Sequence, residues 1–408
     1  MKNVCFYAII TSLIIGGSAC HETTERNPDS MRKLKNTYSS DREFLKKHTE
    51  IIELKRGESA LIIIPCWQGR VMTSTCEGDD GFSFGWINHE LISSGDTLEH
   101  MNPYGGEERL WLGPEGGQFA LFFKQGDPFE YDYWQTPAIM DTESFSLADK
   151  NDTLAVFEKT SKLTNYSGAE FNFFITRIVH LLGLEEISGI VQADLKDLNA
   201  VAYRSENIIE NTGDNEWTKD NGLLSIWMLG MFNPSPSAIV TIPVKKGGID
   251  NYGPVVNDNY FGSIPEERLI VKNNIVHFKA DGLERGKIGI PPLRSKGVMA
   301  SYDRDNNVLT LLFCDVPDGK TEFVNSAWEL QDNPYSGDAL NSYNDGPLED
   351  GSIMGPFYEL ETSSPALSLL PGEKYKHSQI TIHFSGPEDK LEMIYRKVIG
   401  ASMQDIML

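Results

Sequence analysis

The sequence predicts an all-β protein, a sandwich or barrel of many short antiparallel strands with few short helices. Strand-like runs recur at short spacing, and turn signals such as Asn211-Thr212-Gly213 and Pro371-Gly372-Glu373 separate them. Long amphipathic helical patterns are scarce. The 408 residues contain no internal repeat and no Pro- or Ser-rich linker, which favours one large β domain over two smaller domains.

The predicted elements begin with a hairpin. Ala60–Ile64 and Val71–Thr75 are its two strands, and Gln68-Gly69 is the turn between them. Arg109–Leu112 predicts a short strand, and Asp389–Val398 has the apolar spacing of a terminal helix. The other predicted strands are Gln118–Lys124, Leu154–Thr160, Glu170–Leu182, Glu186–Gln192, Val201–Ile209, Leu223–Met231, Ala238–Val244, Arg268–Val271, Val298–Tyr302, Val308–Cys314, Tyr358–Thr362 and Gln379–Phe384.

The N-terminus predicts a secretion signal over residues 1–19. Lys2 precedes an apolar run that is too short and too broken to span a membrane. Four small residues, Gly16-Gly17-Ser18-Ala19, then lead directly to Cys20. This arrangement resembles a bacterial lipobox, in which the cysteine is lipidated and becomes the mature N-terminus; an ordinary cleaved signal is the alternative.

The segment after Cys20 is polar, and residues 20–40 predict a flexible tether. Ser40-Asp41 offers a cap for a short helix that opens the predicted domain, residues 41–408. We therefore expect a protein of the bacterial cell envelope, facing the periplasm or the surface. Its contact with the membrane would be the lipid anchor only.

The charge balance excludes several classes of partner. The formal net charge is −23, and removal of residues 1–19 with Lys2 leaves 35 basic and 59 acidic residues, or −24. Such a chain is not expected to bind nucleic acid or to dock directly on anionic lipid. No Cys/His spacing predicts a zinc site, and no phosphate or dinucleotide fingerprint is present. We expect no metal and no cofactor.

Two carboxylates share one face of the predicted strand Tyr358–Thr362. Side chains alternate along a strand, so Glu359 and Glu361 point one way and their neighbours the other. Buried acids without partners are costly. This face is therefore either exposed to solvent or part of a polar site.

A second notable stretch is Asn102–Gln118, where two glycine pairs bracket Arg109, Trp111 and Glu115. Paired glycines allow sharp bends or close approach of the backbone to a ligand. Arg109 and Trp111 share a face of the predicted strand. A guanidinium beside an indole can bind a sugar, or it can be a structural stack whose charge nearby glutamates satisfy.

These residues carry a resemblance to a known superfamily. Gly105–Glu115, with its Arg-Leu-Trp-Leu-Gly-Pro-Glu segment, resembles the aldose 1-epimerase (galactose mutarotase) superfamily, in particular its uncharacterised secreted branch. Leu360-Glu361-Thr362 and Leu369–Glu373 extend the likeness, and Asn211–Trp227 is similar to the family's central strand pair. The resemblance implies a large antiparallel β-supersandwich that binds a carbohydrate on its concave face.

The resemblance also implies roles for two residues. Glu361 matches the general base that acts on the anomeric hydroxyl, and Arg109 is the best match to the arginine that holds the substrate. The family's histidine acid has no counterpart in Leu223–Phe232. His89 or His100 could enter the site from a loop, whereas a lone strand histidine such as His180 is more often structural.

Three functions stay open at this stage. The leading one is a carbohydrate-binding lipoprotein, possibly an isomerase with Glu361 as base. A non-catalytic glycan-binding protein is the second. A glycosidase or lyase is the third, with Glu361 and a distant acid, because Glu359 and Glu361 project in parallel and cannot flank a glycosidic bond. Further candidate ligand contacts are Glu115, Glu359, Trp86 and Trp134, the two tryptophans because they lie in predicted loops.

Overall fold

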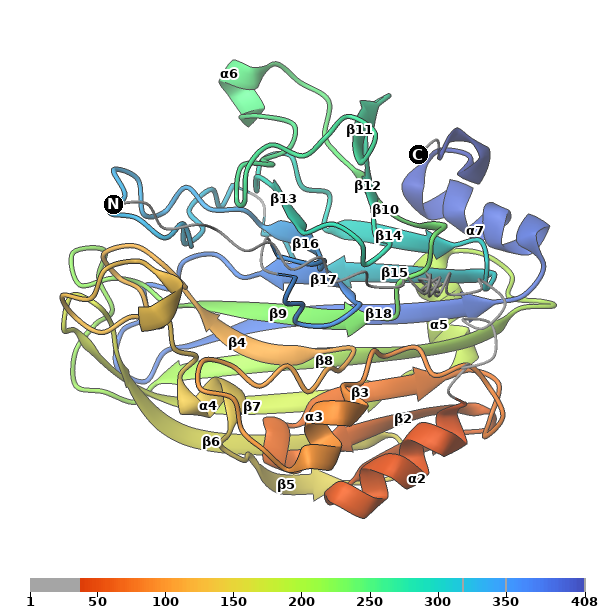
Figure 1. The fold of residues 1–408 in the computed structure, drawn as a ribbon, viewed down its shortest axis with the longest axis horizontal. Helices are drawn as coiled ribbons and strands as arrows, with labels where there is room; N and C mark the ends of the chain where they lie inside the picture. Colours follow the sequence, from red (N-terminus) through yellow and green to blue (C-terminus); the bar gives the residue numbers. More distant parts are fainter. Residues whose placement is uncertain (1–36, 318, 349–350, 407–408) are drawn as a thin grey trace, which may run out of the picture. The chain divides into compact units, whose positions relative to one another are not determined.

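The computed structural model describes residues 37–317, 319–348 and 351–406. The predicted signal peptide, the lipidation site at Cys20 and the tether up to residue 36 lie outside the described residues and stay predictions. The described chain forms three antiparallel sheets joined by long loops and short helices (Figure 1). The predicted all-β class is confirmed.

The largest sheet has ten strands in the order β11-β12-β10-β14-β15-β18-β8-β7-β6-β5. Its long central strands alternate buried and partly exposed side chains, the period-2 pattern of a sheet with two different faces. The strands are β5 (Ser146–Lys150), β6 (Leu154–Thr164), β7 (Glu170–Leu181), β8 (Asn199–Asn211), β10 (Ala238–Pro243), β11 (Leu269–Lys272), β12 (Ile275–Lys279), β14 (Val298–Asp303), β15 (Val308–Cys314) and β18 (Lys374–Ser385).

A five-stranded sheet in the order β13-β16-β17-β9-β4 packs against the large sheet. Its inner face, with Ile288, Leu340 and Leu360, shares a core cluster with Val240 and Leu312 of the large sheet. The two sheets are thus the layers of a sandwich. The strands are β4 (Arg109–Gly113), β9 (Ser225–Phe232), β13 (Gly286–Ile290), β16 (Leu340–Asn344) and β17 (Tyr358–Ser363).

The third sheet contains β1 (Ile52–Arg56), β2 (Ser59–Ile64) and β3 (Arg70–Thr75), the last two being the predicted hairpin. Helix α2 (Tyr38–His48) packs against β3. It begins before the predicted cap, because Thr37 accepts a hydrogen bond from the Ser40 backbone and is the true N-cap.

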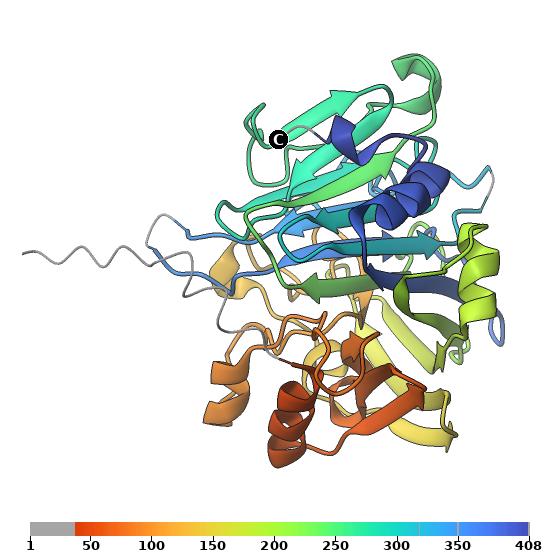
Figure 2. The same cartoon turned by 90° about the vertical axis from the view of Figure 1, so that its right-hand side faces the viewer.

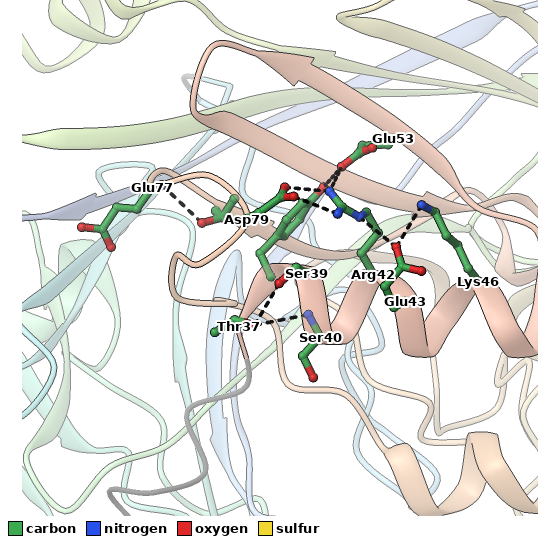
Figure 3. Close-up of polar contacts among 11 residues, drawn as sticks. Thr37, Ser39, Ser40, Arg42, Glu43, Lys46, Glu53, Glu77 and Asp79 are labelled. Carbon is green, nitrogen blue, oxygen red and sulfur yellow. Dashed lines mark hydrogen bonds and ion pairs between the residues drawn. The ribbon is translucent and has the colours of Figure 1, made fainter.

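Ion pairs fasten helix α2 to this sheet (Figure 3). The Arg42 guanidinium donates to both carboxylate oxygens of Asp79, at 2.8 and 3.0 Å, and lies 3.3 Å from Glu53. The buried Tyr38 hydroxyl donates to the same Glu53 carboxylate at 3.0 Å. The first described helix is therefore part of the folded body.

Two helices cover the outer face of the large sheet, as Figure 2 shows. Side chains of α5 and α7 share a core cluster with strands β14, β15 and β18. The terminal helix was predicted, but Glu186–Gln192, predicted as a strand, forms most of α5 and its C-cap Gln192. The helices besides α2 are α3 (His89–Ser94), α4 (Ala138–Asp141), α5 (Leu184–Val191), α6 (Ile249–Tyr252) and α7 (Glu388–Ile399), and the 3-10 turns are η1 (Pro65–Trp67), η2 (Tyr131–Tyr133) and η3 (Met403–Asp405).

One further strand prediction is wrong. Gln118–Lys124 is irregular, although Ala120–Phe123 are buried in the core. The Leu121 backbone donates to the Pro114 carbonyl at 2.9 Å, and this contact folds the segment back on the end of β4 instead of extending it. An apolar run alone does not separate a strand from a buried loop.

Candidate functional site

The outer face of the five-stranded sheet gathers the charged residues of β17. In the strand register, Glu361 pairs with Asn341 of β16 and Leu229 of β9, and Glu359 pairs with Tyr343 and Met231. Directly paired residues point to the same face of a sheet. Glu359 and Glu361 therefore share one face, as predicted, while Leu360 points into the core between the sheets.

Glu361 is fully buried at the centre of this face. Its Oε2 atom accepts hydrogen bonds from Lys287 Nζ on β13 and from Trp227 Nε1 on β9, both at 2.9 Å. Its Oε1 atom has no partner among the described residues. One carboxylate oxygen is thus held in place, and the other is a buried acceptor without a hydrogen bond among the described residues.

Lys287 supplies the positive charge that Glu361 needs. Its side chain is 13% exposed, and its ammonium lies 4.9 Å from the centre of the Trp227 ring and 5.6 Å from that of Tyr260. Burial by itself would lower the pKa of Lys287, but the charges of Glu361 and Glu115 outweigh burial and raise it. The lysine is therefore a cation in neutral solution.

Glu359 forms a second buried ion pair. Arg109 Nη2 on β4 donates to its Oε1 atom at 2.8 Å, and the guanidinium lies 4.4 Å from the centre of the Trp111 ring. Burial raises the pKa of Glu359 to about 7 even though Arg109 opposes the shift. Arg109 stacks on Trp111 and its charge is satisfied by Glu359, which is the structural alternative; a sugar contact for Arg109 stays a prediction.

Glu115 follows β4 and lies at the edge of the site, partly buried. Its backbone N–H donates to Ser326 Oγ at 3.2 Å. Gly116 lets the two loops touch, because a Cβ there would lie 2.3 Å from the Ala327 carbonyl oxygen. Burial raises the pKa of the Glu115 carboxyl, and the charge of Lys287 opposes the shift.

A polar cluster closes the β13 side of the site. Tyr260 donates to Asp338 at 2.5 Å, Asn257 donates to both Asp338 oxygens at 2.8 and 3.0 Å, and Asn341 donates to the Tyr260 hydroxyl at 2.9 Å. Gly289 makes room for this cluster, since a Cβ there would lie 2.0 Å from Asp338 Oδ2. The Asp338 carboxylate thus ties the loop that carries Asn257 and Tyr260 to the sheet.

Asp338→Asn should flatten the pH dependence of stability between about pH 4 and pH 6. Burial raises the pKa of Asp338 from 3.8 to about 6, against the hydrogen bonds from Asn257 and Tyr260. The folded state then binds the proton more tightly than the unfolded chain. This carboxyl therefore makes the free energy of unfolding fall as the pH rises through that window, by about 3 kcal/mol.

Urea denaturation at pH 4, 5, 6 and 7 measures this effect. The wild-type protein should lose about 3 kcal/mol more stability over the window than the Asp338→Asn variant. The exposed Asp305 provides the control, and Asp305→Asn should follow the wild type. Parallel pH profiles for Asp338→Asn and the wild type would contradict the assignment.

A family assignment follows from the sequence. The sequence profile of a family of unknown function, DUF6786, matches residues 36–408. The chain belongs to this family. A search of curated proteins finds no match.

Two solved structures are similar to this chain, and the first supports the assignment of its fold. A putative aldose 1-epimerase from Escherichia coli K12 is 11% identical, with a TM-score of 0.50, and the match covers 83% of this chain and 99% of that one. A galactose mutarotase-like protein from Lactobacillus casei ATCC 334 is 13% identical, with a TM-score of 0.47, over 82% and 100% of the two chains. The fold of this family member is galactose mutarotase-like, as the sequence resemblance implied.

The structure brings four of the predicted site residues together. Glu359 and Glu361 on β17 and Arg109 on β4 lie on one sheet face, on either side of β9, and the charges of Glu115 and Glu361 both act on Lys287. Trp134 lies beside Glu115.

Trp86 lies at the Glu359 end of this face, buried in a small cluster with Met231, Tyr343 and Phe357. Both Trp86 and Trp134 lie outside the strands, as predicted, but both are largely buried. Their loops are therefore packed against the body of the protein.

No histidine is a hydrogen-bond partner of Glu361 among the described residues. His89 pairs with Asp41 at 2.8 Å, and His100 Nδ1 lies 2.6 Å from the Trp134 carbonyl oxygen. His377 forms a hydrogen bond of 2.8 Å with Thr362, and Thr362 lies on the opposite face of β17 from Glu361. Strand β9, in which the resemblance to mutarotases implied a histidine, contributes Trp227 to Glu361.

Sequence reasoning missed Lys287, Tyr260 and Asp338. A signal for Lys287 was available, because Gly286–Ile290 alternates a charged residue with the buried Ile288 and Ile290. Such alternation predicts a strand with Lys287 on a polar face. No local pattern marks Tyr260 or Asp338, which meet only through a loop.

Proposed function

We propose that this protein binds a carbohydrate on the outer face of the five-stranded sheet, with Glu361 at the centre of the site. The observation that carries the proposal is the Glu361 carboxylate, one oxygen of which is held by Lys287 and Trp227 while the other has no hydrogen-bond partner among the described residues. A sugar hydroxyl supplies the donor that this oxygen lacks. The fold, shared with a putative aldose 1-epimerase, supports the same class of ligand.

The chemistry of the face suits a sugar in two further ways. Carboxylates, amides and an ammonium offer acceptors and donors for hydroxyl groups, and the partly exposed Trp328 and Tyr260 rings offer flat apolar surfaces for the C–H groups of a pyranose. The carboxyl groups of Glu115 and Glu361 face the single ammonium of Lys287. An uncharged sugar should therefore bind better than a uronic acid.

A calorimetric titration of the protein with galactose and with galacturonate tests the proposal. Galactose should bind, and galacturonate should bind more weakly. Glu115→Gln should weaken galactose binding about 10- to 100-fold, because a hydrogen bond to a charged acceptor becomes one to a neutral acceptor. The control is Glu322→Gln, which changes an exposed glutamate that is 52% accessible and paired with Lys219. An equal loss in both variants, or tighter binding of galacturonate, would count against this site.

A second candidate, sugar epimerisation, is favoured by the same carboxylate. A general base must present a free oxygen in a fixed orientation, which describes Glu361 Oε1. Glu361 would take the proton of the anomeric hydroxyl, the bond from the anomeric carbon to the ring oxygen would break, and a solvent water would give the ring oxygen its proton and take the one on Glu361. Closure on the other face of the carbonyl would then give the other anomer.

We also propose that lipidated Cys20 holds the protein in the bacterial cell envelope. The support comes from the sequence, in which small residues precede Cys20 after an apolar run. The acidic character of the chain agrees with attachment through the lipid alone, because an acidic surface is repelled by anionic headgroups. No helix of the described residues is long and apolar enough to cross a membrane.

A further inference from the structure

Three aromatic rings form a parallel stack that leads from the candidate site to the surface. The centre of the Trp134 ring lies 6.0 Å from that of Trp328 and 6.1 Å from that of Tyr131, with interplanar angles of 24° and 18°. Trp134 is buried, Trp328 is partly buried, and Tyr131 is 61% exposed. The rings come from two segments far apart in the sequence, so the stack is a product of the fold.

The inner end of the stack adjoins Glu115. The Trp328 and Trp134 side chains lie beside the Glu115 carboxyl, and the loop of Trp328 is fixed to Glu115 by the Ser326 hydrogen bond. The Lys287 ammonium interacts electrostatically with both Glu115 and Glu361.

The outer end of the stack exposes apolar surface that the fold does not cover. Tyr131 is 61% exposed, and Tyr133, in the same 3-10 turn, is 46% exposed. Exposed Asp132 lies between the two tyrosines. Clustered apolar surface at the rim of a site is typical of ligand contact. Aromatic rings can pack against the C–H groups of a pyranose, and polar acceptors between them can bind its hydroxyl groups.

We propose that the Tyr131–Trp134–Trp328 stack extends the site so that the ligand is an uncharged oligosaccharide, with one sugar unit at Glu361 and further units along the stack to Tyr131. This inference rests on the proposed carbohydrate binding. A glycan is favoured over a protein partner because the stack begins at the sugar site. If one unit of a linear glycan binds at Glu361, the other units have to extend over a neighbouring surface, and the stack is such a surface. The carboxylates at Asp132 and Glu115 disfavour a glycan of uronic acids.

The test compares chain lengths by calorimetric titration of the full-length protein. The probes are galactose and β-1,4-galactotetraose, with glucose, cellotetraose and maltotetraose in parallel. We expect at least one tetrasaccharide to bind ten or more times more tightly than its own monosaccharide. Tyr131→Ala should remove most of this gain and leave the affinity for the monosaccharide unchanged.

Leu184→Ala is the control, because Leu184 is 58% exposed but lies on α5, which covers the large sheet. It should change neither affinity, and both variants should match the wild type in thermal unfolding. Equal affinity of the wild type for each monosaccharide and its tetrasaccharide would overturn the inference and leave the proposed function standing. An equal loss of affinity for the monosaccharide and the tetrasaccharide in Tyr131→Ala would also overturn the inference. Absence of binding by every sugar would overturn the proposed function and the inference together.

Discussion

Arg177→Met should lower the free energy of unfolding by about 3–5 kcal/mol, because it leaves a buried carboxylate without its cation. Arg177 on β7 and Glu108 are both fully buried, and their charged groups lie 2.8 Å apart. The guanidinium also donates to Asn207 at 2.6 Å and to the Gly69 carbonyl at 3.0 Å. Burial raises the pKa of Glu108, and Arg177 is the first charge that opposes the shift.

Methionine keeps most of the hydrocarbon of Arg177 but none of its donors. Glu108 would retain the hydrogen bonds from Ser205 at 3.0 Å and Gln379 at 2.8 Å, which do not neutralise it. Combining Arg177→Met with Glu108→Gln should therefore recover part of the loss, since no buried charge remains.

Urea denaturation at neutral pH measures the effect, with Lys162→Met as the control. Lys162 pairs with Glu170 at 2.7 Å, but both side chains are more than half exposed. Removal of such a pair should change stability by no more than about 1 kcal/mol. Comparable losses in Arg177→Met and Lys162→Met would show that burial does not set the cost.

Local periodicity decides which parts of this fold the sequence can predict. The alternation along β17 places Glu359 and Glu361 on one face and Leu360 in the core, because the period of a strand is a property of the backbone itself. The error at α5 has the same origin. Ile187, Ile190 and Val191 favour a strand by residue type, but their spacing is that of one helix face, and Glu186 bonds the Gly183 backbone at the helix start.

Local periodicity cannot predict the hydrogen-bond partners of Glu361. Lys287 and Trp227 reach it from β13 and β9, strands that lie 74 and 134 residues away along the chain. The order β13-β16-β17-β9 decides this encounter, and strand order depends on packing of the whole sheet. The resemblance to mutarotases pointed to Glu361 without identifying the residues that would replace the missing histidine beside it.

Glu361→Gln should slow the interconversion of galactose anomers by about 10²–10⁴ relative to the wild type, because glutamine cannot accept the proton of the anomeric hydroxyl. The amide is isosteric and can still accept hydrogen bonds from Lys287 and Trp227 through its carbonyl oxygen. In that orientation the amide NH2 replaces the Oε1 acceptor, so galactose binding should also weaken, by about 10- to 100-fold, and the rate at saturating galactose should fall as well. Polarimetry of freshly dissolved α-galactose measures the rate, and calorimetry measures the binding.

Glu359→Gln is the matched control on the same strand and the same face. Glu359 is tied to Arg109 at 2.8 Å, so we expect it to support the site without receiving the proton. Its replacement should leave the rate within about tenfold of the wild type, whereas Glu361→Gln removes the acceleration. If Glu359→Gln is the slower variant, the base has been misassigned. If the wild type binds galactose but does not exceed the rate in buffer alone, the Lys287 ammonium holds Glu361 as a binding group and the protein recognises sugars without converting them.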